Sequence, residues 1–204
     1  MTEHAPCPEF DYVVDDSVKS FNIPKLQHID NQEYSGLRYA FVATGAVVIR
    51  STPSSPPSPL KVLLLQRSHT DSSPTLWETP GGACDDEDPT IIYGVARELW
   101  EEAGLKATRI GPRIGEVQVF PIRRGLVGKW SFLVDVEARD DGTVDVLLNE
   151  TEHMDYLWAT EEEVREHRVG EKDIWFTSEV TKRIILEGFR IKKIVEAMAS
   201  EGYS

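Results

Sequence analysis

Three glutamates crowd one short stretch of the chain, at Glu98, Glu101 and Glu102. On a helix, positions i, i+3 and i+4 share one face, so these carboxylates are lateral neighbours with no lysine among them. Like charges at this spacing destabilise an exposed helix by roughly 0.2–0.5 kcal/mol per pair. One interpretation is a solvated acidic face. The other is a cation site, because hard divalent cations take oxygen ligands and would relieve the repulsion.

The charge of the whole chain limits its other partners. The 204 residues carry a formal net charge of −13, which repels phosphate backbones at long range, so long nucleic acids and anionic membrane surfaces are not expected partners. A small phosphorylated ligand stays compatible, because its site needs only local positive charge. Acidic residues cluster again at 85–88 and between Glu150 and Glu163. No apolar run approaches the roughly 20 residues that cross a bilayer.

The glutamates are predicted to lie on the polar side of a helix over residues 90–103. Apolar residues recur there at helical spacing, and Gly104 follows the last of them, where a left-handed C-cap is expected. The preceding segment, residues 68–82, has loop composition throughout and ends in Pro-Gly-Gly. The helix and this turn are the elements that must position the carboxylates.

Strand patterns flank the helix on both sides. Segments 38–50 and 61–68 are rich in β-formers, and the Pro- and Ser-rich segment 51–60 between them cannot pair into a sheet. We therefore expect two strands joined by a mobile insertion. After the helix, three strands are predicted, at residues 117–124, 128–138 and 143–150.

The C-terminal part is predicted to be helical. Thr160 followed by Glu163 has the capping-box pattern that starts a short helix. Residues 177–199 predict a longer helix, whose apolar residues are expected to face mostly inward: Val180, Ile184, Ile185, Phe189, Ile194 and Val195. This order of strands and helices predicts an α/β sandwich, in which helices pack on the faces of a mixed β-sheet.

One domain is expected over residues 37–204, preceded by an extension at 1–36 in which FDYVVDD could form a short strand. The N-terminus lacks the basic and apolar regions of a secretory signal. Cys7 and Cys84 are too few and too far apart for a disulfide framework or a zinc site. A cytoplasmic location with two free thiols is therefore expected.

The segment GACDDEDPTIIYGVARELWEEAGL, residues 82–105, resembles the signature of the Nudix hydrolases, G-x5-E-x7-R-E-U-x-E-E-x-G-U, where U is a bulky aliphatic residue. Every specified position from Arg97 to Leu105 matches. The first half departs, because Asp88 stands where the family has a glutamate and eight residues, not seven, separate it from Arg97. We interpret this as one inserted residue. The resemblance implies a Nudix-type α/β/α sandwich with a mixed β-sheet, an N-terminal extension and a C-terminal helix.

The resemblance also implies a metal centre and its supporting residues. In this family, one to three Mg²⁺ or Mn²⁺ ions bridge to a diphosphate and activate water. By position, the implied ligands are the Gly82 carbonyl and the carboxylates of Glu98, Glu101 and Glu102. Glu102 and Arg97 thereby enter the implied catalytic set. Arg97 is expected to fix the helix or loop by pairing with a carboxylate, for which Glu78 is one candidate.

Residues outside the signature complete the predicted site. The family often takes its general base from a distal loop, which residues 147–158 resemble; Glu152 is the first choice, Glu150 the second, and His153 a further option. The candidate phosphate contacts, each with ordinary surface charge as its alternative, are Arg67, Arg123, Arg124 and Lys129. The aromatic residues that could stack on a base, or else belong to the core, are Tyr39, Phe120, Trp130 and Trp158.

The function that the resemblance implies is metal-dependent hydrolysis of the diphosphate linkage in a nucleoside diphosphate joined to another group. The expected partner is a small-molecule diphosphate, and a homodimer is one assembly that the family allows. Two alternatives stay open. One is a non-hydrolytic Nudix-fold binding module, although such modules commonly lose signature glutamates that this chain keeps. The other is an isopentenyl-diphosphate-isomerase-like enzyme, which ETEHMDY suggests but whose cysteine-bearing motif is absent.

Overall fold

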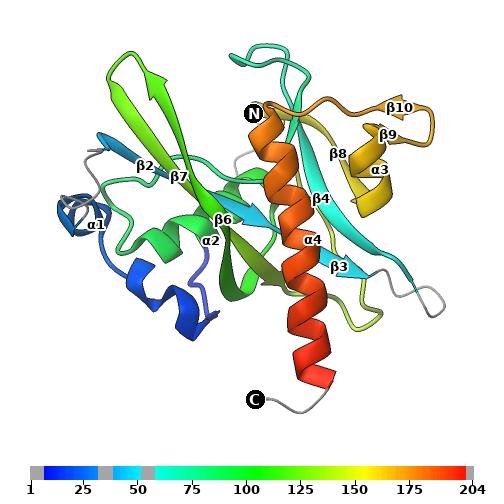
Figure 1. Ribbon diagram of the computed structural model, residues 1–204, viewed down its shortest axis with the longest axis horizontal. Helices are drawn as coiled ribbons and strands as arrows, with labels where there is room; N and C mark the ends of the chain where they lie inside the picture. The colour runs from blue at the N-terminus through cyan, green and yellow to red at the C-terminus, as the bar shows by residue number, and fades with distance from the viewer. Residues whose placement is uncertain (1–6, 32–38, 52–57, 201–204) are drawn as a thin grey trace.

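The computed structural model describes residues 7–31, 39–51 and 58–200 (Figure 1). Most of the Pro- and Ser-rich insertion predicted at 51–60 lies outside these residues, as does the start of the N-terminal extension. The described part forms two four-stranded sheets with helices on both sides, which confirms the predicted α/β/α sandwich.

The first sheet has the strand order β1-β6-β7-β2. Its long hairpin joins β6 (Ala107–Ile122) to β7 (Gly125–Val136), and β7 runs parallel to β2 (Phe41–Val47). The short β1 (Val13–Val14) runs parallel to β6 at the edge. Parallel and antiparallel pairs occur together, so the sheet is mixed, and the strands predicted at 117–124 and 128–138 form its hairpin.

The second sheet is built around β4 (Leu60–Arg67), which pairs antiparallel with β3 (Ile49–Ser51), β5 (Trp77–Glu78) and β8 (His153–Thr160). The segment 68–82, predicted as a loop throughout, therefore contains a two-residue strand, because β4 offers an edge with which it pairs. A separate two-stranded pair joins β9 (Arg168–Val169) and β10 (Lys172–Asp173).

Helices cover opposite faces of the sheets. Helix α2 (Ile91–Ala103) packs on β2 and β6, whereas α4 (Glu179–Ser200) crosses the other side over β6, β3 and β4 (Figure 1). The short α3 (Glu161–Glu166) begins with the predicted capping box of Thr160 and Glu163. Near the N-terminus lie η1 (Asp16–Phe21) and α1 (Lys25–Asn31).

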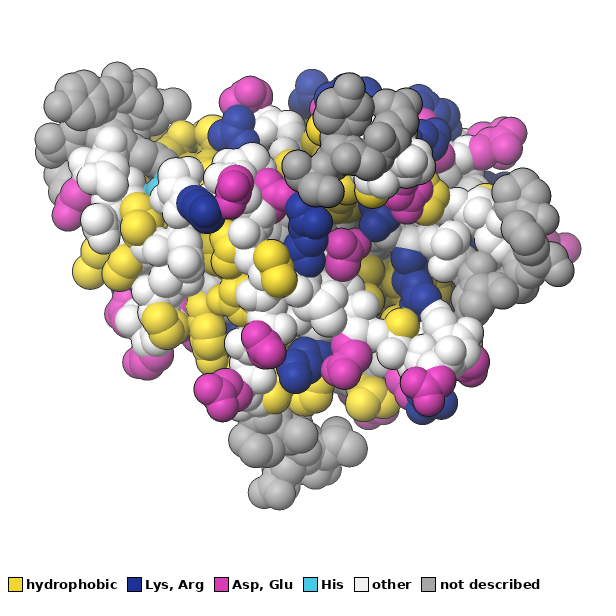
Figure 2. All heavy atoms as spheres, turned by 90° about the horizontal axis from the view of Figure 1, so that it is seen from below, with side chains coloured by type: hydrophobic (Ala, Val, Ile, Leu, Met, Phe, Trp, Pro, Cys, Tyr) yellow, Lys and Arg dark blue, Asp and Glu magenta, His cyan; other side chains and the backbone are white. Residues whose placement is uncertain are grey.

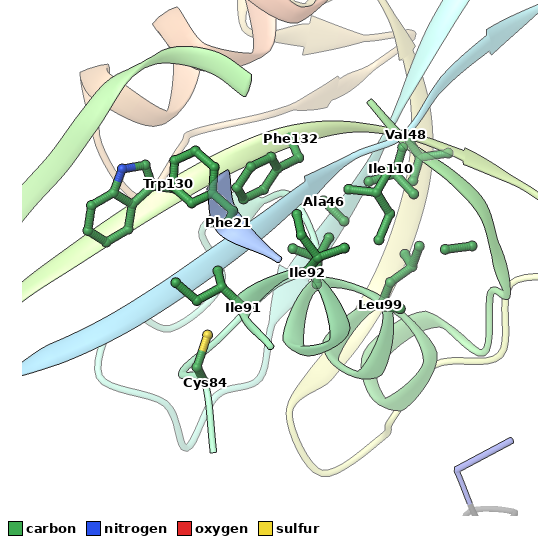
Figure 3. Close-up of a cluster of buried hydrophobic side chains, with 14 of the residues drawn as sticks. Phe21, Ala46, Val48, Cys84, Ile91, Ile92, Leu99, Ile110, Trp130 and Phe132 are labelled. Carbon is green, nitrogen blue, oxygen red and sulfur yellow. The ribbon is translucent and has the colours of Figure 1, made fainter. Parts of the chain in front are cut away.

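Helix α2 begins and ends as its sequence predicts. The Thr90 side chain accepts a hydrogen bond from the Tyr93 amide, and Gly104 adopts the left-handed conformation at φ 64°. Its apolar face packs toward aromatic side chains from η1 and β7 and aliphatic ones from β2 and β6 (Figure 3). The core thus fixes how far α2 is rotated, and with it the direction of its carboxylates.

The strand expected at residues 143–150 is wrong, whereas the inward face expected for α4 holds for most of its residues. Residues 143–150 do not form a strand, because the amides of Leu147 and Asn149 donate to the Ala103 and Glu102 carbonyls at 2.8 and 3.2 Å. Those carbonyls lie in the last turn of α2, where they lack intrahelical partners. On α4, Ile184, Ile185 and Phe189 are buried as expected, but Ile194 is 44% exposed.

The described part of the N-terminal extension is packed into the molecule. Val18 and Phe21 of η1 belong to the core beneath α2, and the Lys25 ammonium donates to the Cys84 carbonyl at 2.7 Å. Cys84 is buried and Cys7 exposed, both as free thiols. On the face shown in Figure 2, basic and acidic side chains are intermixed. In the described residues, every helix is too short or too polar to span a membrane.

Candidate active site

Arg97 is the centre of a buried ion-pair network at the start of the signature. Its Nε and Nη2 donate to the two Asp88 carboxylate oxygens at 2.7 and 2.9 Å. Its Nη1 donates to Glu101 at 2.7 Å and to Glu98 at 3.0 Å. Burial alone would lower the pKa of Arg97, but these carboxylates outweigh it and raise the pKa. Arg97 therefore holds the helix to the loop before it, and Asp88 takes the place that the family gives to a glutamate.

Glu78, the candidate partner of Arg97 from the sequence, does not pair with Arg97. Glu78 lies on β5 in register with Leu65 of β4, and its carboxylate accepts instead from Arg67, two residues further along that strand. Asp88, which lies on the loop that Arg97 reaches, fills the expected role. Arg97 Nη2 also donates to the Ala83 carbonyl at 2.9 Å, so it binds both the backbone and a side chain of this loop.

Glu98 and Glu102 are buried against the two glycines of the Pro-Gly-Gly turn. Glu102 is 6% exposed and accepts a 2.6 Å hydrogen bond from the Gly81 amide. A Cβ atom on Gly82 would lie 2.6 Å from a Glu98 carboxylate oxygen. Only a glycine there lets this carboxylate approach the backbone so closely.

Burial makes the charged forms of these two glutamates costly. It raises the pKa of Glu98 to about 7; Arg97 opposes the rise, and the charges of Glu101 and Glu152 add to it. Burial also raises the pKa of Glu102 well above its ordinary value, against the Gly81 hydrogen bond and with the charges of Glu98 and Glu78. A further positive charge near the glycines would therefore favour the charged forms of both carboxylates.

This donor set fits a hard divalent cation. In the described residues, no three His, Cys, Asp or Glu side chains already converge as a metal site, because Glu98 and Glu101 point to Arg97 and Glu102 to the Gly81 amide. The Gly82 carbonyl accepts from the Thr44 amide at 2.8 Å, which leaves it a second lone pair. Buried carboxylates with raised pKa values beside a carbonyl are oxygen ligands of the kind that Mg²⁺ and Mn²⁺ take.

The loop that carries Glu152 is bound to the end of α2. The 143–150 segment donates to the last carbonyls of the helix, and Glu152 lies in the turn just before β8. The Glu152 side chain is exposed, accepts from Asn149 Nδ2 at 2.9 Å, and is close enough for its charge to raise the pKa of Glu98. Glu150 lies exposed in the same turn.

His153 is buried, unlike its neighbour. It is 2% exposed, and its Nε2 lies 3.6 Å from a Glu78 carboxylate oxygen. Its Nδ1 has no hydrogen-bond partner among the described residues. His153 is therefore enclosed by the protein, whereas the Glu152 side chain next to it in the chain is exposed.

A cavity of about 680 Å³ opens beside the glycine turn. Gly81 and Gly82 line one side, and the β6–β7 hairpin supplies an apolar wall that includes Val119, Phe120 and Ile122. These three side chains are 39%, 40% and 42% exposed, so they are free to contact a ligand. A larger groove, of about 880 Å³, lies between β6 and α4 and contains no signature residue. Of these two, the smaller cavity is the one that a signature residue, Gly82, lines.

Of the predicted phosphate contacts, Arg67 lies in this cavity but is engaged by two carboxylates. Its guanidinium donates to Glu78 and to Asp71, and its hydrogen bond lowers the pKa of Asp71 to about 2. Burial favours a raised pKa for Glu78, but His153, Lys129 and Arg67 outweigh it and lower the pKa. Local sequence patterns do not predict these partners of Glu78, because Arg67, Lys129 and His153 lie on three other strands.

The remaining candidates separate clearly. Arg123 and Arg124 lie in the exposed turn of the β6–β7 hairpin and do not line the cavity; the Arg124 guanidinium lies 5.5 Å from the Phe41 ring centre. Lys129 does line the cavity. Among the aromatic candidates, Phe120 lines the cavity. Tyr39 and Trp130 are buried in the hydrophobic core, and Trp158 packs against that core.

Comparison with known proteins identifies the fold. The NUDIX domain family model matches residues 41–178, which is well over half of the chain. No curated protein matches. Among solved structures, the MutT protein from Methanosarcina mazei Go1 is 24% identical with a TM-score of 0.53, and the match covers 75% of this chain and 94% of that one.

Two further structures carry ligands or complexes in their descriptions. A binary complex of the C. elegans Ap4A hydrolase is 22% identical, with a TM-score of 0.55 and coverage of 76% of this chain and 99% of that one. The Nudix domain of Shewanella oneidensis NrtR, complexed with ADP ribose, is 20% identical, with a TM-score of 0.54 and coverage of 83% and 98%. At these identities the likeness shows the fold. Because the family model spans both the signature helix and the strands that frame the cavity, the chain belongs to the Nudix family and is a hydrolase of phosphorus-containing anhydrides.

Proposed function

We propose that the chain is a divalent-cation-dependent pyrophosphohydrolase that cleaves the diphosphate linkage of a nucleoside diphosphate joined to another group. The observation that carries this proposal is the burial of Glu98 and Glu102 against Gly81 and Gly82, at the edge of a cavity of about 680 Å³. Burying these carboxylates is costly, because Glu98 shares Arg97 with Asp88 and Glu101. A cation that also binds the substrate phosphates would make the arrangement favourable.

The proposed metal ligands are the carboxylates of Glu98, Glu101 and Glu102 and the carbonyl of Gly82. When bound, Mg²⁺ or Mn²⁺ would neutralise charge on the diphosphate oxygens and lower the pKa of water. Arg97 and Asp88 support these ligands by fixing α2 to the loop before it. They act through position and do not contact the substrate.

Glu152 is the proposed general base. It would take a proton from the water molecule as the oxygen attacks one phosphorus, while the bond from that phosphorus to the bridging oxygen breaks. The leaving phosphate keeps the bridging oxygen and its electron pair. The hydrogen bonds from residues 147 and 149 to the end of α2 keep Glu152 near Glu98, so the base and the ligands share one support.

The apolar wall of the cavity suggests the group attached to the diphosphate. Phe120, with Val119 and Ile122 beside it, offers a partly exposed ring to a planar base. The descriptions of the similar structures name Ap4A and ADP ribose. Dinucleoside polyphosphates and ADP ribose are therefore the first compounds to test.

The experiment is a panel of diphosphate compounds incubated with Mg²⁺, with Mn²⁺ and with a chelator, with products identified by mass. The panel adds nucleotide sugars, coenzyme A and isopentenyl diphosphate to the two compounds above. We expect cation-dependent cleavage into two phosphorylated fragments by the wild type and none by Glu102→Gln. Binding without turnover of any compound would favour the ligand-binding module, and an isomerised product would favour the isomerase.

A further inference from the structure

Lys129 lies in the middle of the first sheet, close to the Pro-Gly-Gly turn. It is on β7, in register with Ala43 of β2 and Gln118 of β6, so strands hold it on both sides. A Cβ on Gly45 would lie 3.3 Å from Lys129 Cε, and a Cβ on Gly81 would lie 2.7 Å from Gly45 Cα. The lysine side chain therefore runs beside Gly45, which packs against Gly81, the glycine whose amide donates to Glu102.

Of the cations that line the cavity, Lys129 is the one without an ion pair in the described residues. The charged side chains that line it are those of Arg67, Glu78 and Lys129. Arg67 is engaged by Glu78 and by Asp71. Within the described ranges, Lys129 forms no ion pair, although its charge acts on both Glu78 and Glu102. A half-buried ammonium group without a direct partner favours an anion in the space beside it.

We propose that Lys129 binds the diphosphate of the substrate, and that Arg67 instead positions Glu78 at the cavity wall. This inference rests on the proposed function and names the group that holds its substrate. An ammonium group is a compact charge with three donors, which suits the non-bridging oxygens of a diphosphate. In a chain of net charge −13, such a local cation decides whether an anion can approach.

Lys129 lies on β7, a central strand of the first sheet, which holds its backbone on both sides. Side chains on strands that pair on both sides are placed more accurately than those on loops. Arg123 and Arg124, on the hairpin turn, lack that support and do not line the cavity. The apolar wall of Val119 and Phe120 then lies on the side where the rest of the substrate would extend.

The test measures binding of inorganic pyrophosphate to the full chain by calorimetry, in a chelator so that no metal contributes. Lys129→Met keeps an unbranched side chain as far as Cε and removes the ammonium group, and Lys129→Arg restores the charge. We expect Lys129→Met to weaken binding by roughly ten- to a hundredfold, the range for losing a hydrogen bond to a charged group. Lys129→Arg should recover most of the affinity.

Lys61→Met is the matched control, because Lys61 is a half-buried lysine on β4 that pairs with Thr160, at the end of the strand away from Arg67. It should bind pyrophosphate as the wild type does. Circular dichroism and thermal melting check each fold, and Lys129→Gln replaces Lys129→Met if that variant does not fold.

Unchanged binding by the Lys129 variants, or no pyrophosphate binding by the wild type, would overturn the inference. A different result would contradict the proposed function. In that case pyrophosphate binds through Lys129, but no diphosphate compound is cleaved with Mg²⁺ or with Mn²⁺. Where turnover is found, Lys129→Met should raise KM by about the factor by which it weakens pyrophosphate binding, and Lys129→Arg should largely restore KM.

Discussion

Arg67 and Arg97 are each surrounded by carboxylates, but the pKa values of those carboxylates shift in opposite directions. In the Arg97 cluster, which contains Asp88, Arg97, Glu98 and Glu101, burial raises the pKa of Glu98 to about 7. In the Arg67 cluster, which contains Arg67, Asp71, Glu78 and His153, the pKa values of Glu78 and Asp71 are lowered.

The difference follows from the cations available to each cluster. Arg97 pairs with the three carboxylates of its cluster and also with Asp85 at 3.7 Å, and the charge of Glu98 acts on Glu102 as well. In the Arg67 cluster, Arg67 and the nearby Lys129 balance Glu78 and Asp71. The Arg97 cluster therefore has too little positive charge for its carboxylates, as the proposed metal site would require, whereas the chain itself compensates the Arg67 cluster.

The largest effect on turnover is expected from removing Glu102, a proposed metal ligand beside the Arg97 cluster. Glu102→Gln should lower turnover by about a thousandfold, comparable with the loss of one preorganised group that stabilises a transition state. Steady-state kinetics with Mg²⁺ on the compound cleaved fastest measures it. The control is Glu171→Gln, an exposed glutamate in the turn between β9 and β10. Equal rates for both variants would remove Glu102 from the ligand set.

Replacing each arginine by methionine tests the comparison through stability. Arg97→Met leaves Asp88 buried without its partner and should cost about 3 kcal/mol in the free energy of unfolding. Arg67→Met should cost less, because Glu78 keeps Lys129 and His153 nearby and Asp71 is partly exposed. Denaturant unfolding in a chelator gives both values. A larger loss for Arg67→Met would reverse the ranking of the two clusters.

Glu152→Gln tests whether the exposed carboxylate beside the Arg97 cluster is the base. It should lower the rate by about a hundredfold, the lower range for general base catalysis, and flatten the rise of the rate with pH. The pH profile of kcat separates this role from a structural one. Glu150→Gln, in the same turn, serves as the control. A profile of unchanged shape would assign the base to another residue.

The smallest effect concerns the metal-free protein. Because the pKa of folded Glu98 is raised to about 7 from 4.5, its contribution to stability is present below about pH 4.5 and is lost as the pH rises through about 7. In a chelator at pH 8, Glu98→Gln should therefore melt higher than the wild type, by about 2–4 °C. At pH 4.5 the difference should vanish. Melting curves that differ equally at both pH values would contradict this.

The sequence predicts those parts of the site that lie close together along the chain. The caps of α2, its apolar face and the spacing of Glu98, Glu101 and Glu102 all follow local rules, and the structure contains that helix within one residue. The fold class also follows from the order of the elements, because β-rich segments alternate with helical ones in the pattern of a sandwich.

The rest of the site depends on strand pairing, which local patterns do not determine. Arg67, Glu78 and His153 meet because β4 pairs with β5 and β8 in one register. Residues 143–150 alternate like a strand, yet their amides bind the end of a helix. On α4 the apolar spacing continues to Ile194, although the buried residues of that helix end at Phe189.

Gly104 lies at the junction between the signature helix and the loop that carries Glu152. Its left-handed backbone suits glycine, and a Cβ atom there would lie 2.7 Å from the Leu147 side chain. A larger residue would therefore push that loop away from the helix end. Gly104 therefore has two roles. It ends α2, and it sets the distance between the proposed base, Glu152, and the carboxylates of α2.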